Sequence, residues 1–120
     1  EPLYAQALAI LRDVRDRRTE GIAVGNLAAL YSQTGRLEEA ERTFLEALAI
    51  HREVGHRRFE GIHQCDLALC LLRRGGPAAS ATAWRVGAAI LRELGDHFEL
   101  NRQREAMARA CAEAGVPGFE

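Results

Sequence analysis

The stretch that decides the fold runs from Asn26 to Ile50 and reads NLAALYSQTGRLEEAERTFLEALAI. Its apolar residues recur at steps of three and four on both sides of Gly35, which is the period of an amphipathic helix. Gly35 stands where the first helix must end, because glycine readily adopts the left-handed conformation found at helix C-termini. Glu38 and Glu39 then fall in the first turn of a second helix, where acidic side chains interact favourably with the helix dipole. The stretch predicts two helices joined by a tight turn.

Residues of this stretch recur at a step of forty residues along the chain. The matching sets are Ile10, Ile50 and Ile90; Leu27, Leu67 and Met107; and Gly35, Gly75 and Gly115. A constant period of this size is typical of repeat architectures in which one structural unit stacks on the next. With no segment alternating like a half-buried strand, the pattern predicts an all-α chain with helices at about 2–16, 19–34, 37–54, 58–74, 77–94 and 97–114. Short connections make neighbouring helices antiparallel, and the constant repeat stacks the hairpins in one direction.

The composition is that of one ordinary domain that can bury a core. The 120 residues are 48% hydrophobic and 28% charged, with a formal net charge of −1. Such a balance provides no positive field for nucleic acid or an anionic membrane surface. No apolar run reaches the roughly 20 residues that cross a bilayer, and the first ten residues lack the basic segment of a signal peptide.

Chemistry-bearing residues do not form a recognisable constellation in the sequence. The three cysteines are an odd number, and Cys65 and Cys70 point to different faces of one helix, so free thiols and a cytoplasmic location are expected. The four histidines are interpreted as scattered near helix ends and turns. His63 and Cys65 face different directions and make a poor metal pair. We expect no catalytic residue, no metal, no cofactor and no enzymatic activity.

With the hairpin unit defined, the stretch from Asn26 to Ile50 resembles a tetratricopeptide repeat. The matching positions are Leu27, Ala28, Tyr31, Gly35, Ala40, Phe44 and Ala47, followed in a second copy by Leu67, Ala68, Leu71, Gly75, Ser80, Trp84 and Gly87. The resemblance implies a right-handed α–α superhelix, with small residues where paired helices approach closely and large ones between hairpins. The forty-residue step resembles the long-repeat variant of kinesin light chains and of bacterial regulators.

The resemblance also divides the chain. It implies a single domain over 1–120 with a partial repeat at 1–18, repeats at 19–57 and 58–96, and a terminal capping helix at 97–120. The last helix is more polar than its counterparts, which suits a cap. The first helix has no hairpin partner before it, so we expect a fragment of a longer array with a partly uncovered face near Tyr4, Leu8 and Leu11.

In the family that the chain resembles, the first helix of each hairpin lines a concave groove. The positions that this implies are Ile22, Gly25, Asn26, Ala29, Gln33, Ile62, Cys65, Asp66, Leu69, Arg73, Arg102, Glu105, Arg109 and Glu113. Asn26 matches the asparagine that can bond the backbone of an extended peptide, since an amide both donates and accepts. It could equally bond a neighbouring helix. Asp66 stands at this position in the second copy, so the two copies do not present a continuous series of amide side chains to a peptide.

Two further surfaces keep alternative interpretations. Ile62, Leu69 and Leu72 could offer an apolar strip to an amphipathic helix, or they could be core. The arginine pairs 17–18 and 57–58 share one edge of the stack and could attract an anion. Glu20 and Glu60 lie close by and could instead neutralise that edge.

The function that follows is an interaction module that binds a protein or peptide in a concave groove, as the scaffold or sensor segment of a larger bacterial signalling or transcriptional regulator. That regulatory setting rests on the resemblance alone. One alternative is a switch that responds to a ligand or signal peptide. Another is self-association through the N-terminal helix. Direct binding to nucleic acid or membrane is not expected.

Overall fold

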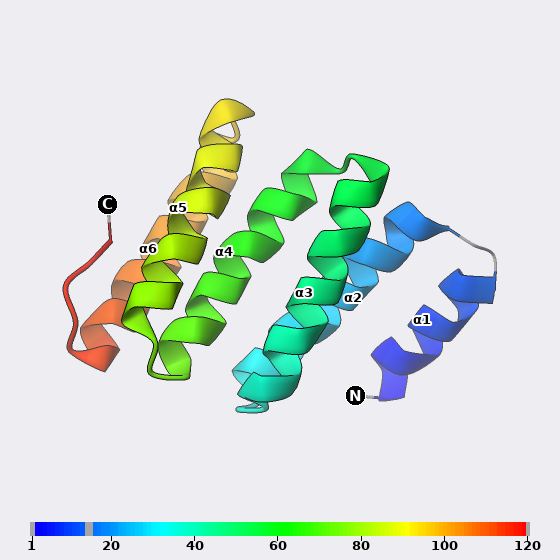
Figure 1. Cartoon of the computed structure of the whole chain (residues 1–120), viewed down its shortest axis with the longest axis horizontal. Coiled ribbons are helices and arrows are strands. Elements are labelled where there is room, and N and C mark those ends of the chain that lie inside the picture. Colours follow the sequence, from blue (N-terminus) through cyan, green and yellow to red (C-terminus); the bar gives the residue numbers. More distant parts are fainter. Residues whose placement is uncertain (1, 14–15, 120) are drawn as a thin grey trace.

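The computed structural model describes residues 2–13 and 16–119, with side chains at residues 2–8 and 16–119. Within these ranges the chain is all-α, and its helices follow one another along the long axis, some in front of others, with the two ends of the chain far apart (Figure 1). The described helices are α1 (Pro2–Asp13), α2 (Arg17–Gln33), α3 (Leu37–Val54), α4 (Arg57–Arg73), α5 (Pro77–Glu93) and α6 (His97–Ala114). The all-α prediction is confirmed.

The predicted helix limits are wrong mainly around the first turn. Asp16 was expected inside the first helix, but it is the N-cap of α2, and its carboxylate accepts a hydrogen bond from the backbone N–H of Thr19 at 3.1 Å. An aspartate in this position satisfies an N–H that has no partner within the helix. Helix α2 therefore starts at Arg17, and α1 is described only as far as Asp13.

Five glycines set the length of every described turn. Gly35, Gly55, Gly75, Gly95 and Gly115 all have φ between 70° and 86°, at a spacing of twenty residues. The residue after each glycine returns its N–H to a carbonyl five residues back, as in the bond from Arg36 N to Tyr31 O at 2.9 Å. This is the Schellman closure, which satisfies carbonyls at the helix end. Helices α3 and α5 therefore begin twenty residues after α2 and α4 begin.

The helices pack as hairpins that stack along the chain, and α4 contacts both α2 and α3. Helices α2 and α3 form one hairpin, and α4 and α5 form the next. Helices α2, α4 and α6 contact one another in succession. The molecule measures 44 × 31 × 20 Å. The first helices of the hairpins thus share one side of the stack, and the positions predicted for the groove all fall on them.

The core consists of three clusters spaced along the stack. Phe44 is fully buried between hairpins, against Leu67 and Cys70 of α4. Burying such a side chain contributes about 2–3 kcal/mol. Ala28, Ala40 and Ala47, predicted to sit where helices approach closely, are likewise fully buried.

At the second hairpin the approach of the helices is closer still. A Cβ on Gly87 would lie 2.6 Å from Cys65 Sγ and 3.0 Å from Gly61 O. The predicted need for a small residue at this position is confirmed.

No helix in the described part of the chain is long and apolar enough to span a membrane.

Candidate functional site: the inner groove of the stack

The residues predicted to line the groove differ in whether a partner can reach them. All lie on α2, α4 and α6. The exposed members are Asn26, Gln33, Arg73, Arg102, Glu105, Arg109 and Glu113; Ile22, Ala29, Asp66 and Leu69 are half-buried; Gly25, Ile62 and Cys65 are buried. Those last three lie in the joints between hairpins and offer no surface. Ile62 is therefore core, and Leu72, further along α4, is 5% exposed. Leu69 alone of the proposed apolar strip reaches the surface.

One hollow on this side lies between α4 and α6. It has a volume of about 330 Å³. Half-buried Leu69, Ala106 and Ala110 make its floor, while exposed Arg73 and Arg109 stand at its edge with Glu113. An apolar floor with a few charged groups around it is the usual composition of a site that binds an organic side chain.

A smaller hollow of about 50 Å³ continues the groove between α2 and α4. Leu69 and Arg73 line both hollows, so the two lie next to each other on either side of α4. Arg73 Nη1 donates to Ser32 Oγ on α2 at 2.7 Å, which holds the guanidinium at the boundary. Phe44 closes the floor of the smaller hollow from α3.

Asn26 and Asp66 make equivalent contacts in successive joints. Asn26 Oδ1 lies 3.3 Å from His63 Nε2, and Asp66 Oδ1 accepts from Gln103 Nε2 at 3.1 Å. Each pair spans 37 residues, and the second is displaced from the first by forty. The expectation that Asn26 could bond a neighbouring helix is confirmed. Because Asn26 stays exposed, its amide N–H groups are not enclosed by that contact.

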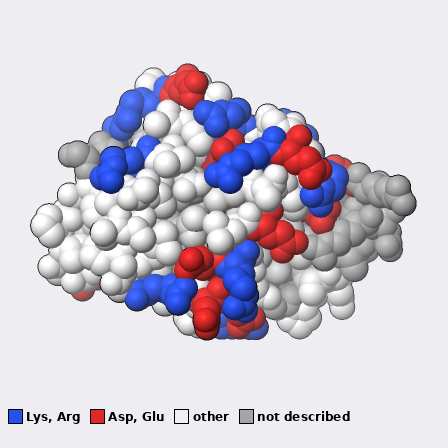
Figure 2. Space-filling view, in the orientation of Figure 1, with Lys and Arg blue, Asp and Glu red and all other residues white. Residues whose placement is uncertain are grey.

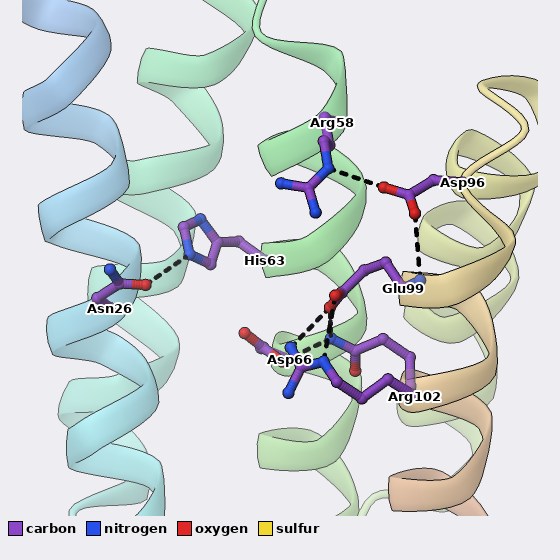
Figure 3. A network of polar contacts seen from close by, with 8 residues as sticks. Asn26, Arg58, His63, Asp66, Asp96, Glu99 and Arg102 are labelled. Carbon is purple, nitrogen blue, oxygen red and sulfur yellow. Dashed lines mark hydrogen bonds and ion pairs between the residues drawn. The ribbon is translucent and has the colours of Figure 1, made fainter.

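Arg102 and Asp66 belong to one polar network at the α4–α6 joint (Figure 3). Arg102 forms two hydrogen bonds with Glu99, at 2.7 and 3.1 Å, and this pairing raises the pKa of its guanidinium. Gln103 bridges Glu99 Oε1 and Asp66 Oδ1, each at 3.1 Å. Burial raises the pKa of Asp66 to about 6, against the lowering effect of the hydrogen bond from Gln103. Arg102 is thus held by its own helix rather than extended into the groove.

Arginines of the edge that carries the arginine pairs bind acidic residues of the same chain. Arg17 binds Glu53 and Glu20, and forty residues later Arg57 binds Glu93 and Glu60. Arg58 binds Asp96 at 2.7 Å. On the face shown in Figure 2, basic and acidic side chains lie next to one another near the margins, with uncharged atoms between. The self-neutralised interpretation is confirmed for Arg17, Arg57 and Arg58.

Residues 18–83 match the family model described as Tetratricopeptide repeat, which covers more than half of the chain. This chain belongs to the tetratricopeptide-repeat family. No curated protein and no solved structure matches it. Tetratricopeptide repeats are non-catalytic modules that generally mediate protein–protein interaction.

Three of the four histidines of this tetratricopeptide stack lie close together, so the interpretation of scattered histidines is wrong for them; His97 is exposed on α6. His51 and His63 are 0% and 1% exposed, and their rings are nearly parallel, with centroids 5.0 Å apart and two facing nitrogens 2.8 Å apart. His56 packs edge-on against His51 and Phe59, and the Phe59 ring is tilted against both His51 and His63. The repeat held a signal for this, because His51 occupies the position of Leu91 forty residues later. A residue that replaces a core leucine is expected to be buried.

The cysteines of the tetratricopeptide stack are packing residues. Cys65, Cys70 and Cys111 are free and buried, as the odd number predicted for at least one of them. Burial raises the pKa of the Cys65 thiol far above its usual value, and it thus suppresses the thiolate that a nucleophile requires. In the described part of the chain, no three His, Cys, Asp or Glu side chains are arranged to hold a metal ion.

Proposed function

We propose that this tetratricopeptide array binds a segment of another protein in the groove along α2, α4 and α6. The observation that supports it most directly is the hollow of about 330 Å³ between α4 and α6, which has an apolar floor and has Arg73, Arg109 and Glu113 at its edge. An apolar side chain of the partner enters this hollow. Acidic residues beside it on the partner bind Arg73 and Arg109, because a guanidinium and a carboxylate form directional, charge-assisted hydrogen bonds.

Asn26 contributes to the same site at its α2 side. Its oxygen is directed to His63, which leaves the amide N–H groups to donate to a backbone carbonyl of the partner. Asp66, at the equivalent place on α4, is half-buried and accepts from Gln103. The partner segment is therefore an acidic peptide or amphipathic helix with an apolar anchor near its middle.

The proposal is tested with the purified chain and a displayed library of random peptides. Leu69→Glu places a charge in the apolar floor, and Arg109→Glu reverses the charge at its edge. Both are expected to lower capture of the selected peptides at least tenfold, which corresponds to about 1.4 kcal/mol. Leu45→Glu is the matched control, because Leu45 is 52% exposed on α3, outside the groove.

Selection of peptides that bind all three variants as well as the parent chain would reject the groove. Equal loss with Leu45→Glu would place the binding surface elsewhere. Circular dichroism of each variant verifies that the helices remain folded.

The wider setting is proposed from family resemblance alone. In it the array is the scaffold or sensor segment of a larger bacterial regulator that acts in the cytoplasm. A ligand-responsive switch is the competing proposal. A small-angle scattering profile that changes on adding the selected peptide supports the switch, whereas an unchanged profile supports a rigid scaffold.

A further inference from the structure

Two buried imidazole rings join the hairpin of α2 and α3 to the hairpin that follows. His51 comes from the last turns of α3 and His63 from the middle of α4. His51 Nε2 and His63 Nδ1 are 2.8 Å apart, and the ring planes differ by 21°. Gly25 of α2 makes room for this pair, since a Cβ there would lie 2.1 Å from His63 Cε1. The joint is built around the rings.

The hydrogen-bond partners determine which nitrogen of each ring carries the proton. The Asn26 oxygen beside His63 Nε2 can only accept, so His63 Nε2 carries the hydrogen and donates. His63 Nδ1 is then bare and accepts from His51 Nε2–H. This leaves His51 Nδ1 bare, and that buried atom has no hydrogen-bond partner in the described structure. Both rings are neutral, and the chain of bonds runs from the core to the groove residue Asn26.

The charges around the pair do not compensate a positive ring. The groups that face it are Arg18 of α2, Glu60 of α4 and His56 of the turn between α3 and α4, with Arg58 beside His56. Glu60 is the one anion among them. It is already bound by Arg52 of α3 and by Arg57, at 3.2 and 3.1 Å. Burial, together with the neighbouring positive groups, lowers the pKa of His51 to about 4 and that of His63 to about 3.

We propose that the pair formed by His51 and His63 is an acid-sensitive latch between the first two hairpins. One added proton goes to the bare Nδ1 of His51, and His51 Nε2–H still donates to His63 Nδ1. A second proton puts hydrogens on both facing nitrogens, so the bond between the rings is lost. The α2–α3 hairpin then separates from α4, and Asn26 leaves its place at the groove. The latch stands independently of what the groove binds.

The next joint of the same chain lacks the latch. Forty residues after His51 and His63 stand Leu91 and Gln103, and Gln103 bonds Asp66 as His63 bonds Asn26. Leu91 packs against Gly61, just as His51 packs against Gly21. The double substitution His51→Leu and His63→Gln therefore rebuilds the first joint with residues that the fold already accepts at the second.

Amide hydrogen exchange of the whole chain at pH 7 and pH 5, corrected for the intrinsic exchange rate, measures opening at each joint. We take a histidine that stays neutral while the joint is closed and has a pKa near 6.5 when the joint is open. Such a histidine increases the population of the open joint about 20-fold between pH 7 and pH 5. Amides of α2 and α3 are expected to lose protection by this factor or more, while those of α5 and α6 do not. The double variant should abolish the effect, and His97→Gln, at an exposed histidine of α6, should leave it intact.

Protection of α2 and α3 that is equal at both pH values would overturn the latch. The latch would also be overturned if α2 and α3 of the double variant lost as much protection at pH 5 as those of the parent chain. If the double variant does not fold, ¹⁵N spectra of the parent chain's imidazoles decide the matter. Two results support the latch. Both buried rings are Nε2–H tautomers at pH 7, and either ring titrates over the same pH range in which the amides of α2 lose protection. Titration of both rings without change in α2 overturns it.

Discussion

At the scale of single residues, Gly25 shows how one contact constrains several positions. It was predicted to line the groove, yet it is buried and faces the imidazole of His63. Forty residues on, Cys65 occupies its place and is fully buried. One further step reaches Glu105, which is exposed on α6. The same position of the repeat is thus buried where another hairpin follows it, and it is exposed where the described stack ends.

Substitution Gly25→Ala is expected to destabilise the chain by about 2–4 kcal/mol, because the new Cβ overlaps a ring that is packed on all sides. The free energy of unfolding in urea measures this cost. Gly118→Ala is the control, since a Cβ at Gly118 meets nothing within 4 Å. In the background of His63→Ala the cost of Gly25→Ala should largely vanish. An unchanged cost there would show that the ring is not what excludes the side chain.

Asp66 carries a second residue-scale prediction, with a defined direction in pH. Its pKa rises from 3.8 to about 6 in the folded chain, so the ionised carboxylate destabilises the fold above about pH 6. This cost diminishes as the pH falls through 6 and is gone below 3.8. Asp66→Asn should therefore stabilise the chain at pH 8 by about 1–2 kcal/mol, and should have little effect near pH 4. Urea unfolding at both pH values tests this, and a variant less stable than the parent at pH 8 contradicts it.

At the scale of elements, the sequence was sufficient to predict where the helices lie, because the apolar period and the turn residues indicate the same helix limits. Apolar steps of three and four marked each helix, and Gly35, Gly75 and Gly115 marked the ends of the first helices. The turn at Asp16 was misplaced, because a capping aspartate next to Arg17 and Arg18 is hard to distinguish from one more polar helical residue. The accessible part of the groove could not be predicted, since it depends on which hairpin covers which helix.

Gly75 provides an element-scale test of the turns. Its φ is 86°, a conformation in which an L side chain is strained, and a Cβ there would contact nothing. Gly75→Ala should cost about 1–2 kcal/mol from backbone strain alone. Gly75→Asn should cost less, because asparagine tolerates this region better than other residues. Thermal unfolding of the two variants gives the order, and an alanine variant as stable as the parent chain would exclude a role for the left-handed turn.

At the scale of the whole molecule, the contacts that stabilise the fold are distributed along the stack of helices. The core has three clusters, and the one around Trp84, Cys65 and Met107 shares none of its buried residues with the cluster around Phe44. Ion pairs such as Arg17 with Glu53 and Arg57 with Glu93 link positions within a hairpin and repeat along the stack. In stacks of this kind each unit contacts only its neighbours, so opening at one end need not involve the other.

Met107→Ala tests this arrangement, since Met107 is 2% exposed in the cluster at the C-terminal end. Loss of its side chain should cost about 2–4 kcal/mol, and hydrogen exchange should locate that loss in α5 and α6. Protection in α2 and α3 should change little, because Phe44 and Leu48 pack in the other cluster. A loss spread equally over α2 to α6 would mean that the chain opens as one unit. In that case acid could not open one joint alone, and the latch at His51 and His63 would have to act on the whole stack.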